Sequence, residues 1–266
     1  GCLGGLAFRG AGAKAAPLHR LFLEQDYGLI NPLQVGKEHY ADLEVHRLMP
    51  KGFARHERML PLLVPLGSLE REQRIELLER TEEWARNHHM PFFSALFTSQ
   101  HEAGYVRAML VDRMVSRRPD QVSVWLRFHD PRVFRHLQWL LDPKQVPALM
   151  GPAVTWLGFD PLCRHWHCWS RPDSPGNQRL RLSQEQWQSV EQFEALNRCL
   201  RDLAELELPT DDDAARRVLE SLLEARRNGL VQDAAAIRFA LRRQTGEAES
   251  QADAEDRQGR PATLNI

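Results

Sequence analysis

One short segment of the sequence holds three side chains that are common in acid and base catalysis. Arg127, His129 and Asp130 stand within four positions, at the end of the hydrophobic run VWLRF. Histidine exchanges a proton near neutral pH, a carboxylate orients it, and arginine binds anions. Asp130 is followed by Pro131, however, and this pair is typical of a helix N-cap and first helical residue. We interpret Arg127, Asp130 and Pro131 as a structural motif, because a carboxylate that caps a helix is a poor general base.

A second segment, CRHWHCW (residues 163–169), holds side chains that suit a transition metal. Cys163, His165, His167 and Cys168 lie within six residues, and zinc is commonly bound by thiolates and imidazoles. In a strand, Cys168 lies on the opposite face from the other three, so all four cannot reach one tetrahedral ion. Three ligands can still converge, but no CxxC or HxxxH spacing supplies further ones. We predict a strand with half-buried histidines and no metal, and keep a small metal-dependent hydrolase as the alternative.

Other signals of catalysis or cofactor binding are missing from the sequence. There is no GxSxG elbow, phosphate-binding loop or GxGxxG fingerprint. The 35 basic and 36 acidic residues give a net charge of -1, which does not favour nucleic acid or anionic membranes as partners. The longest apolar runs, such as MLPLLVPL, are too short to span a bilayer. These features give no signal for catalysis or for a bound cofactor, and we expect neither.

The elements that must position these side chains follow from the hydrophobic pattern. Strand-like and helix-like segments alternate three times before residue 142. The segments are 59–67, 68–89, 91–99, 99–114, 122–128 and 131–141. The stretches PAVTWLGF and RHWHCWS are candidates for added antiparallel strands. This order predicts an α/β fold, in which a mixed sheet carries packed crossover helices.

A change in pattern near residue 171 predicts a boundary between two lobes. The loop RPDSPGNQ is rich in turn formers, and the periodic segments after it are all helical. The sequence indicates a leader at 1–16, an α/β domain at 17–170, a linker at 171–182 and a smaller all-helical lobe at 183–245. The polar segment 246–266 is predicted to be disordered. Four cysteines do not form a disulfide framework in a chain of this length, which favours a reducing, cytoplasmic setting.

Three of the seven tryptophans lie near this predicted boundary. Trp166, Trp169 and Trp187 are candidates for partner binding, because tryptophan is enriched at the centres of interfaces. The alternative is that these rings only pack the two lobes together. Trp125, Trp139 and Trp156 fall in predicted regular elements and are expected to fill the core.

Residues 17–165 also resemble a known bacterial family. The runs RFHDPRV (127–133) and LMGP (149–152) are the most specific, and LPLLVPL, EEWARNH and PFFSALFTS precede them in the family's order. These segments resemble the effector chaperones, or adaptors, of the type VI secretion system. His129 departs from the pattern, since an aromatic residue is usual there.

The resemblance implies a function in binding and not in catalysis. A chaperone of this family binds a toxic effector inside the producing cell and helps load it onto the VgrG spike protein. The expected partners are therefore a cognate secreted effector and VgrG. The sequence does not identify the effector or the stoichiometry.

Overall fold

The computed structural model describes residues 19–172 and 179–246. The predicted leader (1–16), most of the loop at 171–178 and all of the predicted tail except Gly246 lie outside these residues. The chain divides into two compact units, with residues up to Leu182 in the first and residues from Ser183 onward in the second. Each unit is described by itself.

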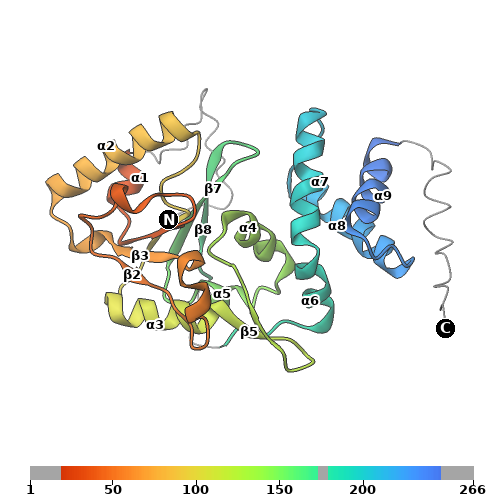
Figure 1. The fold of residues 1–266 in the computed structure, drawn as a ribbon, viewed down its shortest axis with the longest axis horizontal. Helices are drawn as coiled ribbons and strands as arrows, with labels where there is room; N and C mark the ends of the chain where they lie inside the picture. Colours follow the sequence, from red (N-terminus) through yellow and green to blue (C-terminus); the bar gives the residue numbers. More distant parts are fainter. Residues whose placement is uncertain (1–18, 173–178, 247–266) are drawn as a thin grey trace, which may run out of the picture. The chain divides into compact units, whose positions relative to one another are not determined.

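The first unit contains eight described strands and five described α-helices (Figure 1). The strands are β1 (Tyr27–Ile30), β2 (His46–Arg47), β3 (Leu62–Pro65), β4 (Ala95–Thr98), β5 (Val115–Arg117), β6 (Ser123–Trp125), β7 (Thr155–Asp160) and β8 (His165–Ser170). The helices are α1 (His19–Leu23), α2 (Arg71–His88), α3 (Ala103–Met114), α4 (Pro131–Leu140) and α5 (Val146–Met150). Three short 3-10 helices, Lys37–His39, Ala54–Met59 and Leu66–Ser68, complete the unit.

Six of these strands form one sheet in the order β2-β3-β1-β4-β7-β8. Each described neighbouring pair in it is antiparallel. Because β3 and β4 both run antiparallel to β1, they are parallel to each other, and α2 is the crossover between them. The predicted α/β class with packed helices is confirmed, and the predicted strands at 59–67, 91–99, 152–159 and 164–170 are all present.

The predicted strand at 122–128 does not join this sheet. Its residues 123–125 form β6, which pairs only with β5 in a separate two-stranded hairpin, with Val115 opposite Trp125. The sheet instead contains β1, whose sequence YGLI is buried at all four positions. Position 28 of β1 has room for glycine only, because a Cβ atom there would lie 2.6 Å from the ring of Phe93.

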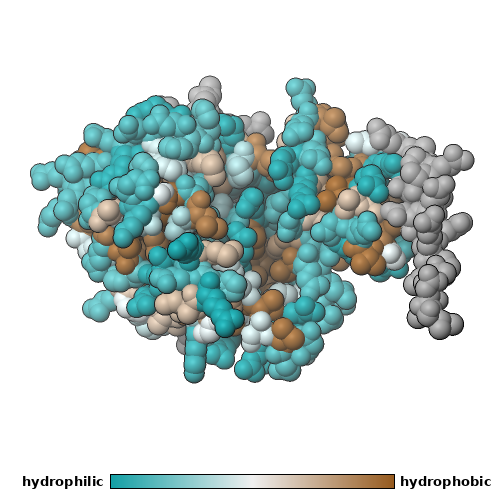
Figure 2. Space-filling model, viewed as in Figure 1, coloured by the Kyte–Doolittle hydropathy of each residue, from teal (hydrophilic) through white to brown (hydrophobic). Residues whose placement is uncertain are grey.

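The two faces of the sheet carry separate layers of the core. On one face, α1 and α2 cover apolar residues that include Ile30, Val64, Leu96 and Leu157. On the other face, Tyr27, Phe97, Trp156 and Trp169 lie opposite one another in turn across β1, β4, β7 and β8. The helix α4 lies against this face of the sheet (Figure 1). The outer side of α2 is hydrophilic in the view of Figure 2, as expected for a helix with one buried face.

The close packing of α4 on this second face has a local cause at Gly158. A Cβ atom at this position of β7 would lie 3.2 Å from Cβ of Pro131 and 3.2 Å from the ring of Trp169. Glycine therefore allows the first turn of α4 to approach the sheet. This contact fixes the position of the motif that contains Asp130.

The second unit consists of α6 (Gln184–Glu191), α7 (Phe193–Glu205), α8 (Asp212–Arg227) and α9 (Asp233–Thr245) in its described part. The helices α7, α8 and α9 pack against one another. The spacing of Val218, Leu219 and Leu222 in the sequence predicts one apolar face of a helix. All three side chains are buried in α8. The predicted all-helical C-terminal region is confirmed. Among the described residues, none of the helices has the length and apolarity needed to cross a lipid bilayer.

The spacing of short polar residues in the sequence predicts four further helix caps, at Ser99, Asp142, Ser183 and Thr210. Ser183 and Gln186 form the predicted capping box of α6. Ser99 does not cap α3, which begins one turn later with Glu102 at the N-cap position, while the hydroxyl of Ser99 donates to the carbonyl of Pro152. Asp211 caps α8 in place of the predicted Thr210. Asp142 also fails as a cap, because a turn at residues 143–145 separates it from α5. Short polar residues near a helix start compete for the cap, and spacing alone does not decide between them.

Candidate functional site

Asp130 caps α4, as the sequence predicts. Its Oδ1 atom accepts a hydrogen bond from the backbone N–H of Arg132 at 3.0 Å, and Pro131 occupies the first helical turn. The guanidinium of Arg132 also donates to both carboxylate oxygens, at 3.0 and 2.7 Å. Arg127 lies farther away, with its Nη2 atom 3.5 Å from Oδ2. The carboxylate is thus held mainly by Arg132, which the sequence reasoning did not single out.

These contacts set the charge of the carboxylate. Burial alone would raise the pKa of Asp130, but the hydrogen bonds and charge of Arg132, with a smaller effect from Arg127, bring it below its ordinary value. Asp130 is therefore ionised at neutral pH and committed to the helix end. An ionised carboxylate that is fully paired is weakly basic, which argues against a role as general base.

The cap predicts a graded response to substitution. Asp130→Asn keeps an oxygen that can accept the backbone N–H of Arg132, whereas Asp130→Ala removes it and should lower the free energy of unfolding by about 1 kcal/mol. Thermal unfolding of the two variants measures the difference. An equal loss of stability in the two variants would contradict this prediction, because it would show that the charge and not the capping oxygen carries the effect.

His129 is buried in this motif and lies between aromatic side chains. Its ring stacks on Trp125 with centroids 5.9 Å apart and contacts Phe128 edge to face. The Nδ1 atom of His129 is buried and has no hydrogen-bond partner in the described structure. Burial lowers the pKa of His129 from 6.5 to about 4, with Asp130 acting to raise it and Arg127 to lower it. The histidine therefore serves as a neutral aromatic ring, consistent with the aromatic residue that is usual in the resembling family.

This lowered pKa predicts a dependence of stability on pH. Between pH 6.5 and 4 the unfolded chain protonates His129 while the folded chain does not. Stability is therefore full above pH 6.5 and falls as the pH is lowered to 4, by up to about 3 kcal/mol from this residue. Urea unfolding at several pH values should show this slope, and His129→Phe should flatten it. An unchanged slope in His129→Phe would contradict the prediction.

The second segment singled out in the sequence lies at the end of the β7–β8 hairpin. Potential ligand atoms of Cys163, His165 and His167 lie within 4.8 Å of one another, with Cys163 exposed and the histidines half-buried. Cys168 alternates to the opposite face of β8, as predicted. The structure thus brings three of the four predicted side chains together.

The same hairpin contains a buried ion pair that sequence reasoning missed. Oδ2 of Asp160, the last residue of β7, accepts a hydrogen bond from Nη1 of Arg135 at 2.6 Å. Both side chains are less than one tenth exposed. Burial would raise the pKa of Asp160, but His167, Arg135 and the backbone N–H of Leu162 hold it well below its ordinary value. Asp160 therefore stays ionised at neutral pH.

Two of the three tryptophans predicted to bind a partner, Trp166 and Trp169, lie on opposite faces of the sheet. Trp166 lies on the α2 side of the sheet, where it packs against Phe159 with centroids 5.7 Å apart. Trp169 lies on the α4 side and contacts Phe134 edge to face. Trp187 is a buried residue of α6 in the second unit. The sheet separates the first two rings, and the partner-binding role of each of the three stays a prediction.

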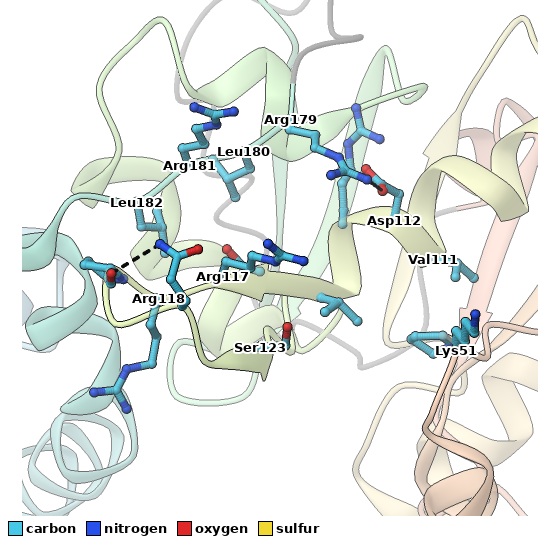
Figure 3. A pocket seen from close by; sticks show the side chains of 16 residues that line it. Lys51, Val111, Asp112, Arg117, Arg118, Ser123, Arg179, Leu180, Arg181 and Leu182 are labelled. Atoms are coloured by element: carbon cyan, nitrogen blue, oxygen red, sulfur yellow. Dashed lines mark hydrogen bonds and ion pairs between the residues drawn. The ribbon is translucent and has the colours of Figure 1, made fainter.

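The first unit also contains a pocket of about 720 Å³ with a strongly positive lining. It lies along the β5–β6 hairpin, and residues 179–182 form another part of its wall (Figure 3). Six of its lining residues are basic and one is acidic: Lys51, Arg113, Arg117, Arg118, Arg179, Arg181 and Asp112. Three of these cations are already engaged, since Arg179 pairs with Asp112, Arg118 pairs with Asp120, and Arg113 donates to the carbonyl of Ala148.

The other three basic residues of the pocket are exposed. Lys51, Arg117 and Arg181 project from three different segments of the chain. Apolar side chains, among them Val115 and Leu180, also line the pocket. A chain with a net charge of -1 therefore carries a local positive site with apolar surface. The basic runs SRR (116–118) and RLR (179–181) were the signal in the sequence, but their proximity depends on the fold.

Comparison with known proteins supplies one match. Residues 44–148 match the model of a family described as Domain of unknown function (DUF4123). The match covers less than half of the chain, from the strand β2 to the first residues of α5. No curated protein and no solved structure shows significant similarity to the chain. The matched residues include the capping motif of α4 and most of the pocket lining.

Proposed function

We propose that this protein is an adaptor that binds a secreted effector of a type VI secretion system and helps load it onto the VgrG spike. The observation that carries the proposal is the position of the family match. Residues 44–148 lie inside the stretch 17–165 that resembles the effector chaperones, and they contain RFHDPRV. The proposed setting is the cytoplasm of the producing cell, where effector and adaptor would meet.

The geometry of the capping motif supports a binding function over a catalytic one. Asp130 is occupied by the backbone and guanidinium of Arg132, and His129 is buried among aromatic rings. A general base must reach a substrate proton and accept it. Neither side chain is placed for this, so the most specific part of the resemblance stabilises the fold.

The positive pocket supplies a surface for the partner. Exposed cations and apolar side chains in one pocket complement a peptide segment that carries both carboxylates and apolar residues. Arginine pairs with carboxylates through two parallel hydrogen bonds, which adds geometric specificity to the charge attraction. We assign the pocket to an acidic, partly apolar segment of the effector.

Charge reversal tests this assignment. The double variant Arg117→Glu/Arg181→Glu should weaken effector binding by about tenfold or more, because attraction at two exposed cations becomes repulsion. Higher salt should weaken wild-type binding in the same direction. Isothermal titration calorimetry with the purified effector measures both effects. Arg201→Glu, which changes an exposed arginine of α7, is the matched control and should bind normally.

Deletion of the gene separates the adaptor function from a structural one. Secretion of one effector should stop, while other effectors and the secretion apparatus remain active. A general loss of secretion would indicate a structural component and would overturn the proposal. Complementation with the double charge-reversal variant should fail to restore the effector if the pocket is the binding site.

A further inference from the structure

We propose that Cys163, His165 and His167 form a zinc site at the end of the β7–β8 hairpin. This inference is independent of the adaptor function. It rests on three side chains of the ligand types that zinc prefers, whose ligand atoms lie within 4.8 Å of one another. It replaces the expectation, drawn from spacing alone, that this segment holds only half-buried histidines.

The backbone of the hairpin explains why these side chains meet. Asp160 pairs with His165 across the two strands, and residues 161–164 make the turn between them. Arg164 has a φ of 54°, in the left-handed region, where the turn enters β8. Alternation along β8 then places His165 and His167 on one face, with ring centroids 4.2 Å apart. Cys163 lies in the turn beside them.

The histidine nitrogens provide a second, independent observation. The Nε2 atoms of both His165 and His167 are buried and lack a hydrogen-bond partner in the described structure. Nε2 of His167 lies 3.5 Å from Oδ2 of Asp160, which is the outer limit of a hydrogen bond. Buried polar atoms are normally paired, and two unpaired imidazole nitrogens in one place indicate a missing bonding partner. A metal ion would supply it.

Asp160 completes the surroundings of the site. Its Oδ2 atom lies 3.5 Å from Sγ of Cys163 and 3.5 Å from Nε2 of His167, and Arg135 holds the carboxylate in place. Carboxylates beside metal-bound histidines fix the orientation of the rings and balance the charge of the ion. We assign Asp160 this positioning role, because its oxygen is already engaged by Arg135.

The ligand set indicates which metal would bind. One thiolate and two imidazoles suit zinc, whereas calcium and magnesium require oxygen ligands. On binding, the thiol of Cys163 releases its proton to solvent and the sulfur bonds to the ion. Three protein ligands leave one tetrahedral position for a water molecule or another ligand.

Titration of the reduced, metal-free protein with Co²⁺ tests the site. We expect a thiolate-to-cobalt charge-transfer band and the visible bands of tetrahedral Co²⁺, saturating at one equivalent, with Zn²⁺ displacing both. Cys163→Ser should lose the charge-transfer band. Cys168→Ser, which changes the thiol on the opposite face of β8, should retain it.

Thermal unfolding provides a readout that does not depend on cobalt. Zn²⁺ should raise the melting temperature of the wild-type protein and of Cys168→Ser, but not of Cys163→Ser or His167→Gln. The proposal is overturned if wild-type protein shows no charge-transfer band, or if Cys163→Ser keeps it. Equal stabilisation of all four proteins by Zn²⁺ would show adventitious surface binding and would also overturn it.

Discussion

Replacing Asp160 with alanine should lower the free energy of unfolding by about 3 to 5 kcal/mol, one of the two largest effects that we expect of any single substitution. The carboxylate forms a 2.6 Å ion pair with Arg135, and both side chains are buried. Removing it leaves a buried guanidinium without this counter-charge. The backbone N–H groups of Leu162 and Cys163 also lose an acceptor at the hairpin turn. Urea unfolding in metal-free buffer measures the loss.

A double substitution separates the cost of an unpaired charge from the value of the pair. Asp160→Leu/Arg135→Met removes both charges and should recover much of the stability lost in Asp160→Leu alone, because buried ion pairs are often replaceable by apolar residues. If the double variant is no more stable than Asp160→Leu, the ion pair is not the reason for the loss. The hydrogen bonds that Asp160 accepts from the backbone of the hairpin turn would then account for the lost stability.

Replacing Trp156 with alanine should cost a similar amount, about 3 to 5 kcal/mol. Trp156 is 1% exposed and stacks on Phe97 and Phe134, with ring centroids 5.1 and 4.7 Å away. It therefore joins β4, β7 and α4 in one aromatic layer. The substitution leaves a cavity that these rigid rings cannot fill. Chemical denaturation of the variant tests the expected loss.

Trp166→Ala and Trp169→Ala serve as controls for this core position. Both rings are partly exposed, so their removal should cost less stability than that of Trp156. If either ring is an anchor for a partner, its loss should weaken the complex by more than about tenfold while the free protein stays folded. A greater loss of stability in Trp166→Ala than in Trp156→Ala would contradict this view of the core.

The parts of the fold that the sequence predicted have strong local signals. The apolar positions of α4 and α8 recur with the helical period, and Asp130 followed by Pro131 marks a helix start. The hairpin strands β7 and β8 are rich in aromatic and β-branched residues or flanked by turn residues. The residues within each of these elements determine its type and its ends, so the elements can be predicted from a single sequence.

The parts that were missed depend on tertiary contacts. Strand β1 has only four residues, YGLI, and lacks an alternating pattern because both of its faces are buried. Strand β6 has the composition of a sheet strand, but it pairs with β5, which follows directly after α3. Neither outcome follows from propensity, since the choice of partner strand is made by the whole fold.

The candidate sites also combine residues with a local sequence signal and residues that only tertiary packing brings together. Alternation along a strand predicted that Cys163, His165 and His167 share a face. The structure brings their ligand atoms within 4.8 Å of one another, but Cys163 reaches the two histidines from the turn before β8. Arg135 and Asp160 are 25 positions apart, and their pairing follows only from the packing of α4 on β7. The positive pocket likewise gathers cations from separate segments, and no sequence window contains them together.

The most direct test of the adaptor proposal is recovery of the effector with the purified protein. The tagged chain is isolated from cells in which the secretion system is active, and the copurifying proteins are quantified by mass spectrometry. We predict one effector in near-stoichiometric amount with the wild-type chain and with Arg201→Glu, and its loss with Arg117→Glu/Arg181→Glu. Absence of any effector from the wild-type preparation, in cells that secrete effectors normally, would contradict the proposed function.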